Sequence, residues 1–327
     1  PSDHMCNGKT LTTQDSSHIK VFPNKNYGGS GGFTRGMMEA VKKGGYTHVL
    51  LMDDDISFEP EVFIKTIRIL QYTKKSNTPL WVGGQMLMED SPQLQYESGA
   101  CFKNGRIIGF GRNLDLSQEQ NLFENEKEKE VQYNAWWYCC IPIECIHNSG
   151  LPLPFFIKAD DIEYGLRINP EILLMNGIGV WHTDFSQKYS PYLEYYIKRN
   201  ELIVSALYQN GNGSLAGIKK LIRSAGKAIL IGDPKTVKFL LLAYEDYLKG
   251  PDFFLDLDDE KNHLNLLKQN KEKPKSRIKS FLTDPFRVFW MCCKFLFSYW
   301  KVEKKYLDGI SKLTSWDFWR RRLEIEK

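Results

Sequence analysis

The feature that most constrains the fold is an apolar run, residues 49–52, that leads directly into Asp53, Asp54 and Asp55. Four consecutive apolar residues predict a buried strand of a parallel sheet, and such sheets carry their chemistry at the carboxyl ends of their strands. Three carboxylates there repel one another unless a cation or a positive substrate group neutralises them. Hard divalent cations, which also bind diphosphate, suit such a site. The run therefore predicts metal-assisted nucleotide chemistry, with an acidic helix cap as the alternative.

The elements around the triplet predict a βαβ unit. Residues 18–22 predict a short strand, residues 33–45 a helix that ends at two glycines, and residues 47–52 a second strand. This order favours a parallel sheet with a right-handed crossover. Pro60 then begins another helix, because proline is well tolerated at the first helical position.

The character of the chain changes near residue 205. Residues 80–115 alternate short apolar runs with Gly and Asn, which predicts strands and turns, and the charged residues 121–130 predict an exposed loop. Beyond residue 205 the chain is rich in Leu, Ile and Lys and predicts helices. With 42% hydrophobic and 26% charged residues, the chain is globular and not disordered. We therefore predict an α/β catalytic domain over residues 1–205 and a helical domain over residues 206–327.

Positive charge is concentrated in the second domain. Residues 268–327 contain 16 Lys and Arg against 7 Asp and Glu, although the net charge of the whole chain is +4. Within them, residues 285–300 are strongly apolar but short for a transmembrane helix, and they include Arg287 and Lys294. Basic flanks around an aromatic helix suit an anionic membrane surface; a helix packed on the catalytic domain is the alternative. No recognised motif supports nucleic-acid binding.

The seven cysteines form neither a zinc-type spacing nor an obvious disulfide framework. In a chain of this length, such a pattern favours a reducing cytoplasm.

A glycine-rich segment, residues 26–33 (NYGGSGGF), precedes the first predicted helix. Such a turn exposes backbone N–H groups and lets a phosphate or nucleotide approach closely. It matches neither the P-loop nor the dinucleotide fingerprint, so a flexible linking loop explains it equally well. Arg35, a little further on, suits either a diphosphate or a surface acid.

A second acidic cluster, Asp160, Asp161 and Glu163, follows the apolar residues 153–157. One carboxylate of a close pair can act as a general base, and like-charge repulsion from its neighbour raises its pKa. The alternative is a capping box, with Asp160 as the N-cap and Glu163 as its partner.

Trp136 and Trp137 are adjacent, and on a strand they would point to opposite faces, so at least one is expected to leave the core. A sugar-stacking platform is one interpretation, and core aromatics are the other. His182 is a candidate metal ligand if the fold returns it to the aspartate triplet; otherwise it is an ordinary core or surface histidine.

Together these motifs resemble family 2 glycosyltransferases of the GT-A fold, and most closely the bacterial galactofuranosyltransferases that extend galactan chains. The matching segments span about residues 19–205 and comprise residues 26–36, 53–55, 136–137, 152–167, 181–182 and 195–200.

The resemblance implies a mostly parallel sheet flanked by helices, and transfer with inversion at the anomeric carbon. It implies that Asp53, Asp55 and His182 hold Mn²⁺ or Mg²⁺, and that Asp161 is the catalytic base with Asp160 in support. The implied donor-binding residues are Asn26, Gly28, Gly29, Arg35 and Asp54, and the implied acceptor-binding residues are Trp136, Trp137 and Glu163.

The donor implied by the resemblance is UDP-galactofuranose, and the acceptor is a growing glycan carried on a lipid at the inner face of the cell membrane. The nearest alternative changes the donor to dTDP-rhamnose or another activated hexose. Alternatives from other classes are a non-catalytic sugar-binding subunit and a metal-dependent phosphohydrolase. Family members begin with a strand, a helix and a strand that build much of the uridine pocket; with residues 1–25 alone before the glycine-rich segment, we expect these strands to be incomplete.

Overall fold

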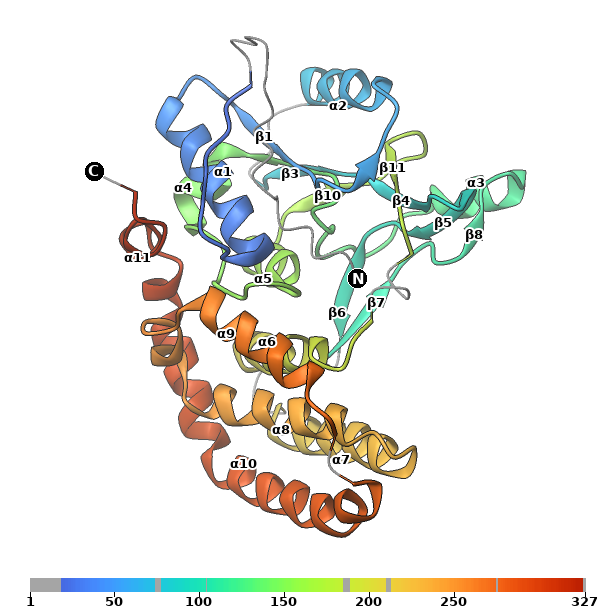
Figure 1. The fold of residues 1–327 in the computed structure, drawn as a ribbon. Helices are drawn as coiled ribbons and strands as arrows, with labels where there is room; N and C mark the ends of the chain where they lie inside the picture. Colours follow the sequence, from blue (N-terminus) through green and yellow to red (C-terminus); the bar gives the residue numbers. More distant parts are fainter. Residues whose placement is uncertain are drawn as a thin grey trace.

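The computed structural model describes residues 19–73, 78–103, 105–184, 189–209, 213–274 and 276–325. Figure 1 shows a sheet-containing part at the top and a layer of helices below it. The chain is therefore a mixed α/β protein, as the sequence predicts.

The upper part contains a four-stranded sheet with the order β1-β9-β3-β10. The β3–β10 pair is parallel, and the β1–β9 and β3–β9 pairs are antiparallel. The strands are β1 (His48–Leu51), β9 (Cys139–Pro142), β3 (Leu80–Gly83) and β10 (Glu171–Leu173).

A second sheet has the order β2-β11-β4-β5-β8, and β6 and β7 form a separate hairpin. In this sheet only the β11–β4 pair is parallel, so that two of the eight strand pairs in the described residues are parallel. The strands are β2 (Ile56–Ser57), β11 (Gly179–His182), β4 (Gln85–Met88), β5 (Ser91–Glu97), β8 (Leu114–Asp115), β6 (Ala100–Lys103) and β7 (Arg106–Gly109).

The prediction of a mostly parallel sheet is therefore wrong. Its basis was a βαβ unit, but residues 19–22 are not a strand, and residue 18 lies outside the described residues. The partner of β1 is instead β9, which lies far along the chain and runs antiparallel to it. A short apolar run has the same pattern in either direction of pairing, because burial and not strand direction sets its composition.

Helices pack on the sheets and form the lower layer. Those of the upper part are α1 (Gly28–Lys43), α2 (Glu61–Tyr72), α3 (Glu119–Asn125), α4 (Ile143–Ser149) and α5 (Asp160–Ile168). Those of the lower part are α6 (Leu193–Tyr208), α7 (Gly213–Leu230), α8 (Pro234–Leu248), α9 (Asp259–Lys271), α10 (Arg277–Leu313) and α11 (Trp316–Arg322), with a short 3₁₀ helix over Pro251–Phe254.

The two predicted helices are confirmed as α1 and α2, but α1 begins at Gly28, inside the segment predicted to be a turn. α1 ends at Gly44, whose positive φ of 68° suits glycine, and Lys42 and Lys43 in its last turn favour the negative end of the helix dipole. α2 begins directly after Pro60. The predicted loop over residues 121–130 is wrong in its first half, because α3 extends to Asn125, which is buried.

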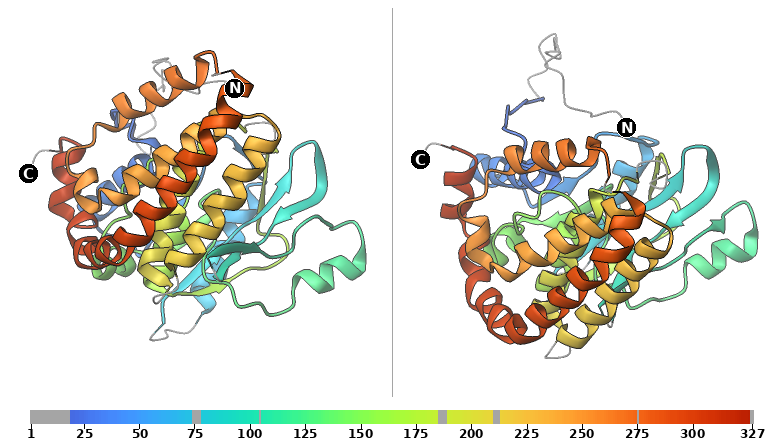
Figure 2. Two further views of the ribbon diagram at one scale, coloured as in Figure 1. Left: turned by 90° about the horizontal axis from the view of Figure 1, so that it is seen from below. Right: turned by 60° about the horizontal axis from the view of Figure 1, so that its bottom comes forward.

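One hydrophobic core runs from the sheets into the helical layer. It includes Met37 of α1, Trp81 of β3, Leu202 of α6 and Phe295 of α10. α6 packs against α7, α8 and α10, and the view from below shows α10 lying across the other helices (Figure 2). The boundary predicted at residue 205 falls inside α6, and the division into two domains stays a prediction.

Among the described helices, none combines the length and the hydropathy that crossing a bilayer requires.

Candidate active site

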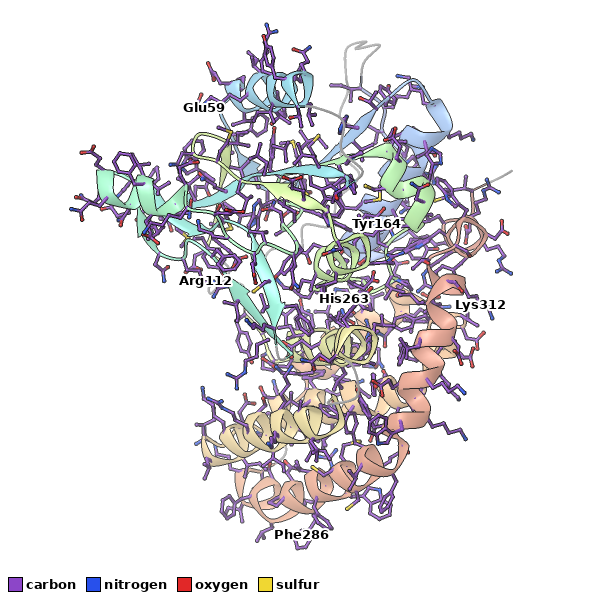
Figure 3. All side chains as sticks on the ribbon, turned by 180° about the vertical axis from the view of Figure 1, so that it is seen from behind. Glu59, Arg112, Tyr164, His263, Phe286 and Lys312 are labelled. Atoms are coloured by element: carbon purple, nitrogen blue, oxygen red, sulfur yellow. The ribbon has the colours of Figure 1, made fainter. Side chains whose placement is uncertain are left out.

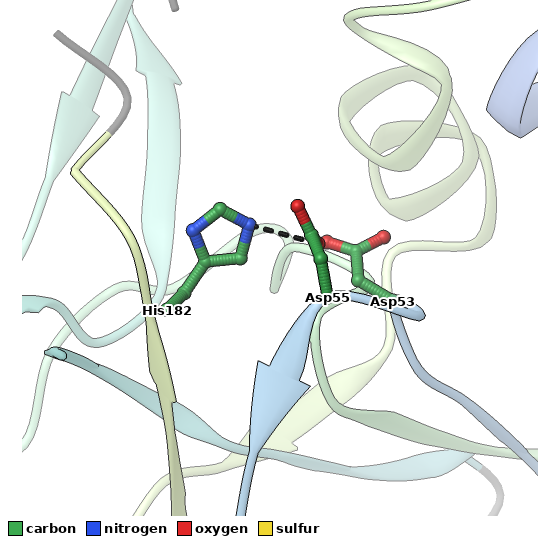
Figure 4. A group of neighbouring side chains, drawn as sticks. All are labelled: Asp53, Asp55 and His182. Atoms are coloured by element: carbon green, nitrogen blue, oxygen red, sulfur yellow. Dashed lines mark ion pairs between the residues drawn. The ribbon is translucent and has the colours of Figure 1, made fainter. Parts of the chain in front are cut away.

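Three side chains that could hold a metal meet beyond the end of β1. Asp53 and Asp55 follow β1, and His182 is the last residue of β11. One ligand atom from each residue lies within 4.8 Å of the others, and His182 Nε2 is 3.1 Å from Asp55 Oδ1 (Figure 4). The antiparallel pairing of β11 with β2 sets this distance, because it places His182 opposite Ile56, the residue after Asp55.

The chemistry of this cluster fits a divalent cation. Burial and then the charge of Asp55 raise the pKa of Asp53 to about 6, so a cation would relieve a repulsion that is built into the site. His182 Nδ1 lies 2.5 Å from the carbonyl oxygen of Thr183. A carbonyl only accepts, so Nδ1 carries the proton and Nε2 faces the carboxylates. Two carboxylates and one imidazole nitrogen are a donor set that Mn²⁺ accepts and that Mg²⁺ tolerates.

The second acidic pair lies at the start of α5. Ser30 Oγ of α1 donates to Asp160 Oδ2 over 2.9 Å, and the backbone N–H of Ile162 donates to Asp161 Oδ1 over 2.8 Å. Burial and then the charge of Asp160 raise the pKa of Asp161 to about 8. The carboxylate of Asp160 is also close enough to contribute to the raised pKa of Asp53. The fold therefore brings the two acidic clusters together.

The capping-box alternative for this pair is wrong. The residue before α5 is Ala159, and no side chain caps the helix. Glu163 instead accepts hydrogen bonds from Arg167 Nη2 (2.9 Å) and Tyr208 Oη (2.7 Å) in the interior. Asp160 and Asp161 are thus not explained by helix capping.

The segment before α5 has an unusual backbone. Phe156, Lys158 and Ala159 all have φ near +70°, a conformation that costs non-glycine residues free energy. Asn200 of α6 holds this segment: its Nδ2 donates to the carbonyl oxygens of residues 155, 157 and 158 over 3.3, 2.9 and 2.7 Å. Arg199 Nη2 adds a bond to the first of these carbonyls over 2.9 Å. α6 therefore positions the acidic pair.

The glycine-rich segment packs against the same backbone. Gly28 has φ +66°, and a Cβ there would lie 2.1 Å from the carbonyl oxygen of Phe156. The N–H of Ser30 donates to that oxygen over 3.2 Å, and the N–H of Gly28 donates to Asn26 Oδ1 over 3.1 Å. Close packing against the backbone before α5 thus explains a glycine at position 28, whether or not a nucleotide binds there.

The other predicted donor residues lie near this segment. Gly29 belongs to the first turn of α1, and Asp54 is exposed beside the metal cluster. Arg35 Nε pairs with Glu39 Oε1 over 2.9 Å within α1, as the surface-acid alternative expects. Donor binding by these residues stays a prediction.

Both tryptophans are buried, so the expectation that at least one would leave the core is wrong. They lie in a turn before β9 and not on a strand, which lets both side chains point inward. Trp136 packs edge-on against Phe33 and Tyr164, and Trp137 Nε1 donates to the carbonyl oxygen of Gly84 over 2.8 Å. Trp136 Nε1 has no acceptor among the described residues. Acceptor binding by these tryptophans and by Glu163 stays a prediction.

No sequence pattern assigned a role to three residues that the structure adds to the site. Ser30 and Asn200 reach it from other helices, and the buried Glu97 of β5 contributes to the raised pKa of Asp161. Arg112 Nη2 and Nε bind one carboxylate oxygen of Glu97 over 2.6 and 2.9 Å. Ser30 and Asn200 stand in the matching segments 26–36 and 195–200, but their contacts could not be predicted because their partners are distant in the chain.

A cavity of about 750 Å³ lies between α1 and β1. It is lined by residues such as Phe33, Met37 and Met52, and none of the acidic residues of the two clusters lines it. The cavity is therefore separate from the chemical groups of the site.

The sequence was also compared with those of known proteins. No family model matches the chain. Over 251 residues the chain is 31% identical to galactofuranosyltransferase GlfT2 of Mycolicibacterium smegmatis, which covers 72% of the chain and 38% of that relative. Over 261 residues it is 31% identical to galactofuranosyltransferase GlfT2 of Mycobacterium tuberculosis, which covers 74% of the chain and 40% of the relative. This similarity supports a glycosyltransferase.

The chain spans about two fifths of the length of these curated relatives. The predicted resemblance to galactofuranosyltransferases is confirmed as a similarity of sequence. Membership of family 2 and the GT-A arrangement of the sheet stay predictions.

Proposed function

We propose that the chain is an inverting, metal-dependent glycosyltransferase of family 2 with a GT-A catalytic domain, which moves galactofuranose from UDP-galactofuranose to a growing glycan. The observation that carries this proposal is the proximity of the Asp53–Asp55–His182 cluster to the Asp160–Asp161 pair. A transferase needs one group of residues for the donor diphosphate and another for the acceptor proton, and the two clusters supply both. The similarity to galactofuranosyltransferases favours this sugar over rhamnose.

Asp53, Asp55 and His182 hold the Mn²⁺ or Mg²⁺ ion in this proposal. When bound, such a cation neutralises the donor diphosphate and stabilises the departing nucleoside diphosphate. Asp54 and the start of α1 contact the donor beside it. The proton on Nδ1 of His182 keeps Nε2 directed at the two carboxylates.

Asp161 accepts the proton of the attacking hydroxyl group. A base works best when its pKa lies near the working pH, and burial brings the pKa of Asp161 to about 8. Asp160, held by Ser30, supplies a negative charge that stabilises the protonated form of Asp161. The acceptor oxygen attacks the anomeric carbon from the side opposite the leaving diphosphate, so the configuration inverts and no covalent sugar–enzyme intermediate forms.

We place the acceptor, a glycan, over Trp136, Trp137 and Glu163, which are buried and would support the acceptor surface from beneath. Nε1 of Trp136 has no acceptor among the described residues, and because it is buried, a glycan hydroxyl would reach it only after the surface above it opens. A lipid-linked acceptor, with the enzyme at the inner face of the cell membrane, completes the proposal.

Release of UDP from UDP-galactofuranose tests this proposal. We expect release that requires both Mn²⁺ and a galactan-like acceptor, and that disappears in Asp161→Asn while the thermal unfolding midpoint does not fall. Turnover with dTDP-rhamnose in place of UDP-galactofuranose would keep the mechanism and change the donor. Phosphate release without an acceptor would identify a phosphohydrolase, and sugar binding that survives Asp161→Asn without turnover would identify a binding subunit.

A further inference from the structure

The first two thirds of α10 expose a row of large apolar side chains. Phe286 and Phe297 are 76% and 87% exposed, and the other members of the row are more than half exposed. The row comprises Leu282, Phe286, Phe289, Trp290, Phe297 and Trp300. At 100° per residue these positions fall within an arc of about 100°, and they extend over about 27 Å of helix. They form one continuous stripe, which we call the α10 apolar stripe.

The fold does not need this stripe. A different face of α10, which includes Met291, Phe295 and Tyr299, is buried in the core that joins the helices to the sheets. The helix is thus anchored along its length by one apolar face while it presents a second to solvent. In Figure 1 the first part of α10 runs along the lower edge of the molecule before the helix rises along its side, and Figure 3 places Phe286 at that lower edge, away from the sheets.

Positive charge borders the stripe. Arg287, Lys294 and Lys301 are exposed and follow one another at intervals of seven residues, which places them on one side of the helix. Two acidic residues occur in α10 before Leu307, namely Asp284 and Glu303, and both are buried. The exposed charge of this part of α10 is therefore entirely positive.

We propose that the α10 apolar stripe lies on the surface of an anionic lipid bilayer, with its rings at the level of the headgroups and Lys294 and Lys301 against lipid phosphates. Bulky aromatic residues on one face and lysines beside them are the composition of helices that lie in the membrane interface. The buried face keeps α10 parallel to the molecular surface, so that it lies on the bilayer. A dimer formed through the same stripe with two-fold symmetry would bring together the two rows of Arg287, Lys294 and Lys301. Their charges would not stabilise such a dimer.

This proposal adds a membrane-binding surface to the membrane location proposed above. It does not depend on the reaction that the protein catalyses. Its test is flotation of the full chain with vesicles, which is read without turnover. Wild-type protein should float with vesicles of equal parts phosphatidylglycerol and phosphatidylcholine, and should bind pure phosphatidylcholine vesicles far more weakly. Added salt should weaken the binding.

Two double variants separate the apolar and the charged contributions. Phe286→Gln with Phe297→Gln should lower the partition coefficient roughly ten-fold or more, because two rings no longer enter the interface. Lys294→Gln with Lys301→Gln should lower it roughly 30-fold at low salt, since each lysine near an anionic surface contributes about five-fold. Both variants should keep the wild-type thermal unfolding midpoint, because the replaced side chains are exposed.

A matched control replaces aromatic residues of similar exposure in the upper part of the molecule. Tyr72→Gln with Phe123→Gln changes side chains that are 82% and 67% exposed on α2 and α3, and vesicle binding should be unchanged. Equal binding to both kinds of vesicle, or an equal loss in this control, would overturn the proposal. So would a dimer in sedimentation velocity that the Phe286 and Phe297 substitutions dissociate, because the stripe would then belong to an interface between copies.

Discussion

Asn200 should control both the stability of the protein and its turnover, although it touches neither acidic cluster. Its Nδ2 donates to three backbone carbonyls of the segment that leads into Asp160. Its Oδ1 accepts a bond from Arg199 Nε over 3.0 Å. Asn200→Asp keeps an oxygen facing Arg199 and removes the donors that face the carbonyls. The substitution therefore removes the carbonyl contacts, and it also places a buried negative charge beside the carbonyl oxygens, which Arg199 offsets only in part.

The expected loss follows from what these contacts hold in place. Each hydrogen bond contributes about 1 kcal/mol net, and the two N–H groups of Nδ2 serve three carbonyls, so the contacts give about 2 kcal/mol, to which the buried charge adds. Phe156, Lys158 and Ala159 each carry strain of about 1 kcal/mol or more, which the segment can release once the bonds are gone. We expect Asn200→Asp to lower the free energy of unfolding by about 3 kcal/mol, and to lower kcat at least ten-fold because the acidic pair is no longer positioned.

The assay is urea unfolding followed by tryptophan fluorescence, together with UDP release at saturating donor. Asn121→Asp is the control, because Nδ2 of Asn121 in α3 donates to a single carbonyl, that of Asp115 in β8, over 2.9 Å. This control should cost about 1 kcal/mol and leave kcat unchanged. Equal unfolding midpoints for the two variants, or a wild-type kcat in Asn200→Asp, would refute the positioning role.

Four further results are expected. The kcat/KM for UDP release should rise with pH to a plateau, with a midpoint at about pH 8, because Asp161 must be ionised to accept a proton. A pH profile of kcat/KM that is flat from about 6 to 9 would contradict this. The folded-state pKa of Asp161 lies above its unfolded value of 3.8, so the metal-free protein should lose stability progressively as pH rises from about 4 to about 8, and Asp161→Asn should remove that loss in thermal unfolding. His182→Ala should weaken Mn²⁺ binding at least ten-fold in calorimetric titration, and because the imidazole is buried it should also lower the unfolding midpoint without metal; unchanged affinity would exclude His182 as a ligand. Gly28→Ala should lower the free energy of unfolding by about 2 kcal/mol or more, whereas Gly36→Ala, which meets no atom within 4 Å, should be neutral or stabilising by up to about 1 kcal/mol in denaturant unfolding.

Features that depend on neighbouring residues could be predicted from the sequence. The helix over residues 33–45, the strand before Asp53 and the helix after Pro60 all appear as α1, β1 and α2. Apolar spacing, glycine and proline act within a few residues, so they leave a local record. Both acidic clusters were recognised in the same way, because each follows an apolar run.

The assembly of the site depends on pairings that no local pattern records. The spacing of His182 from Asp55 comes from the register of β11 against β2, and the resemblance to a known family, not periodicity, pointed to that pair. The direction of β1, the burial of both tryptophans and the role of Asn200 likewise depend on contacts between distant segments. A side chain's neighbours along the chain set its local conformation, but its burial, hydrogen bonds and pKa are set by segments that folding brings beside it.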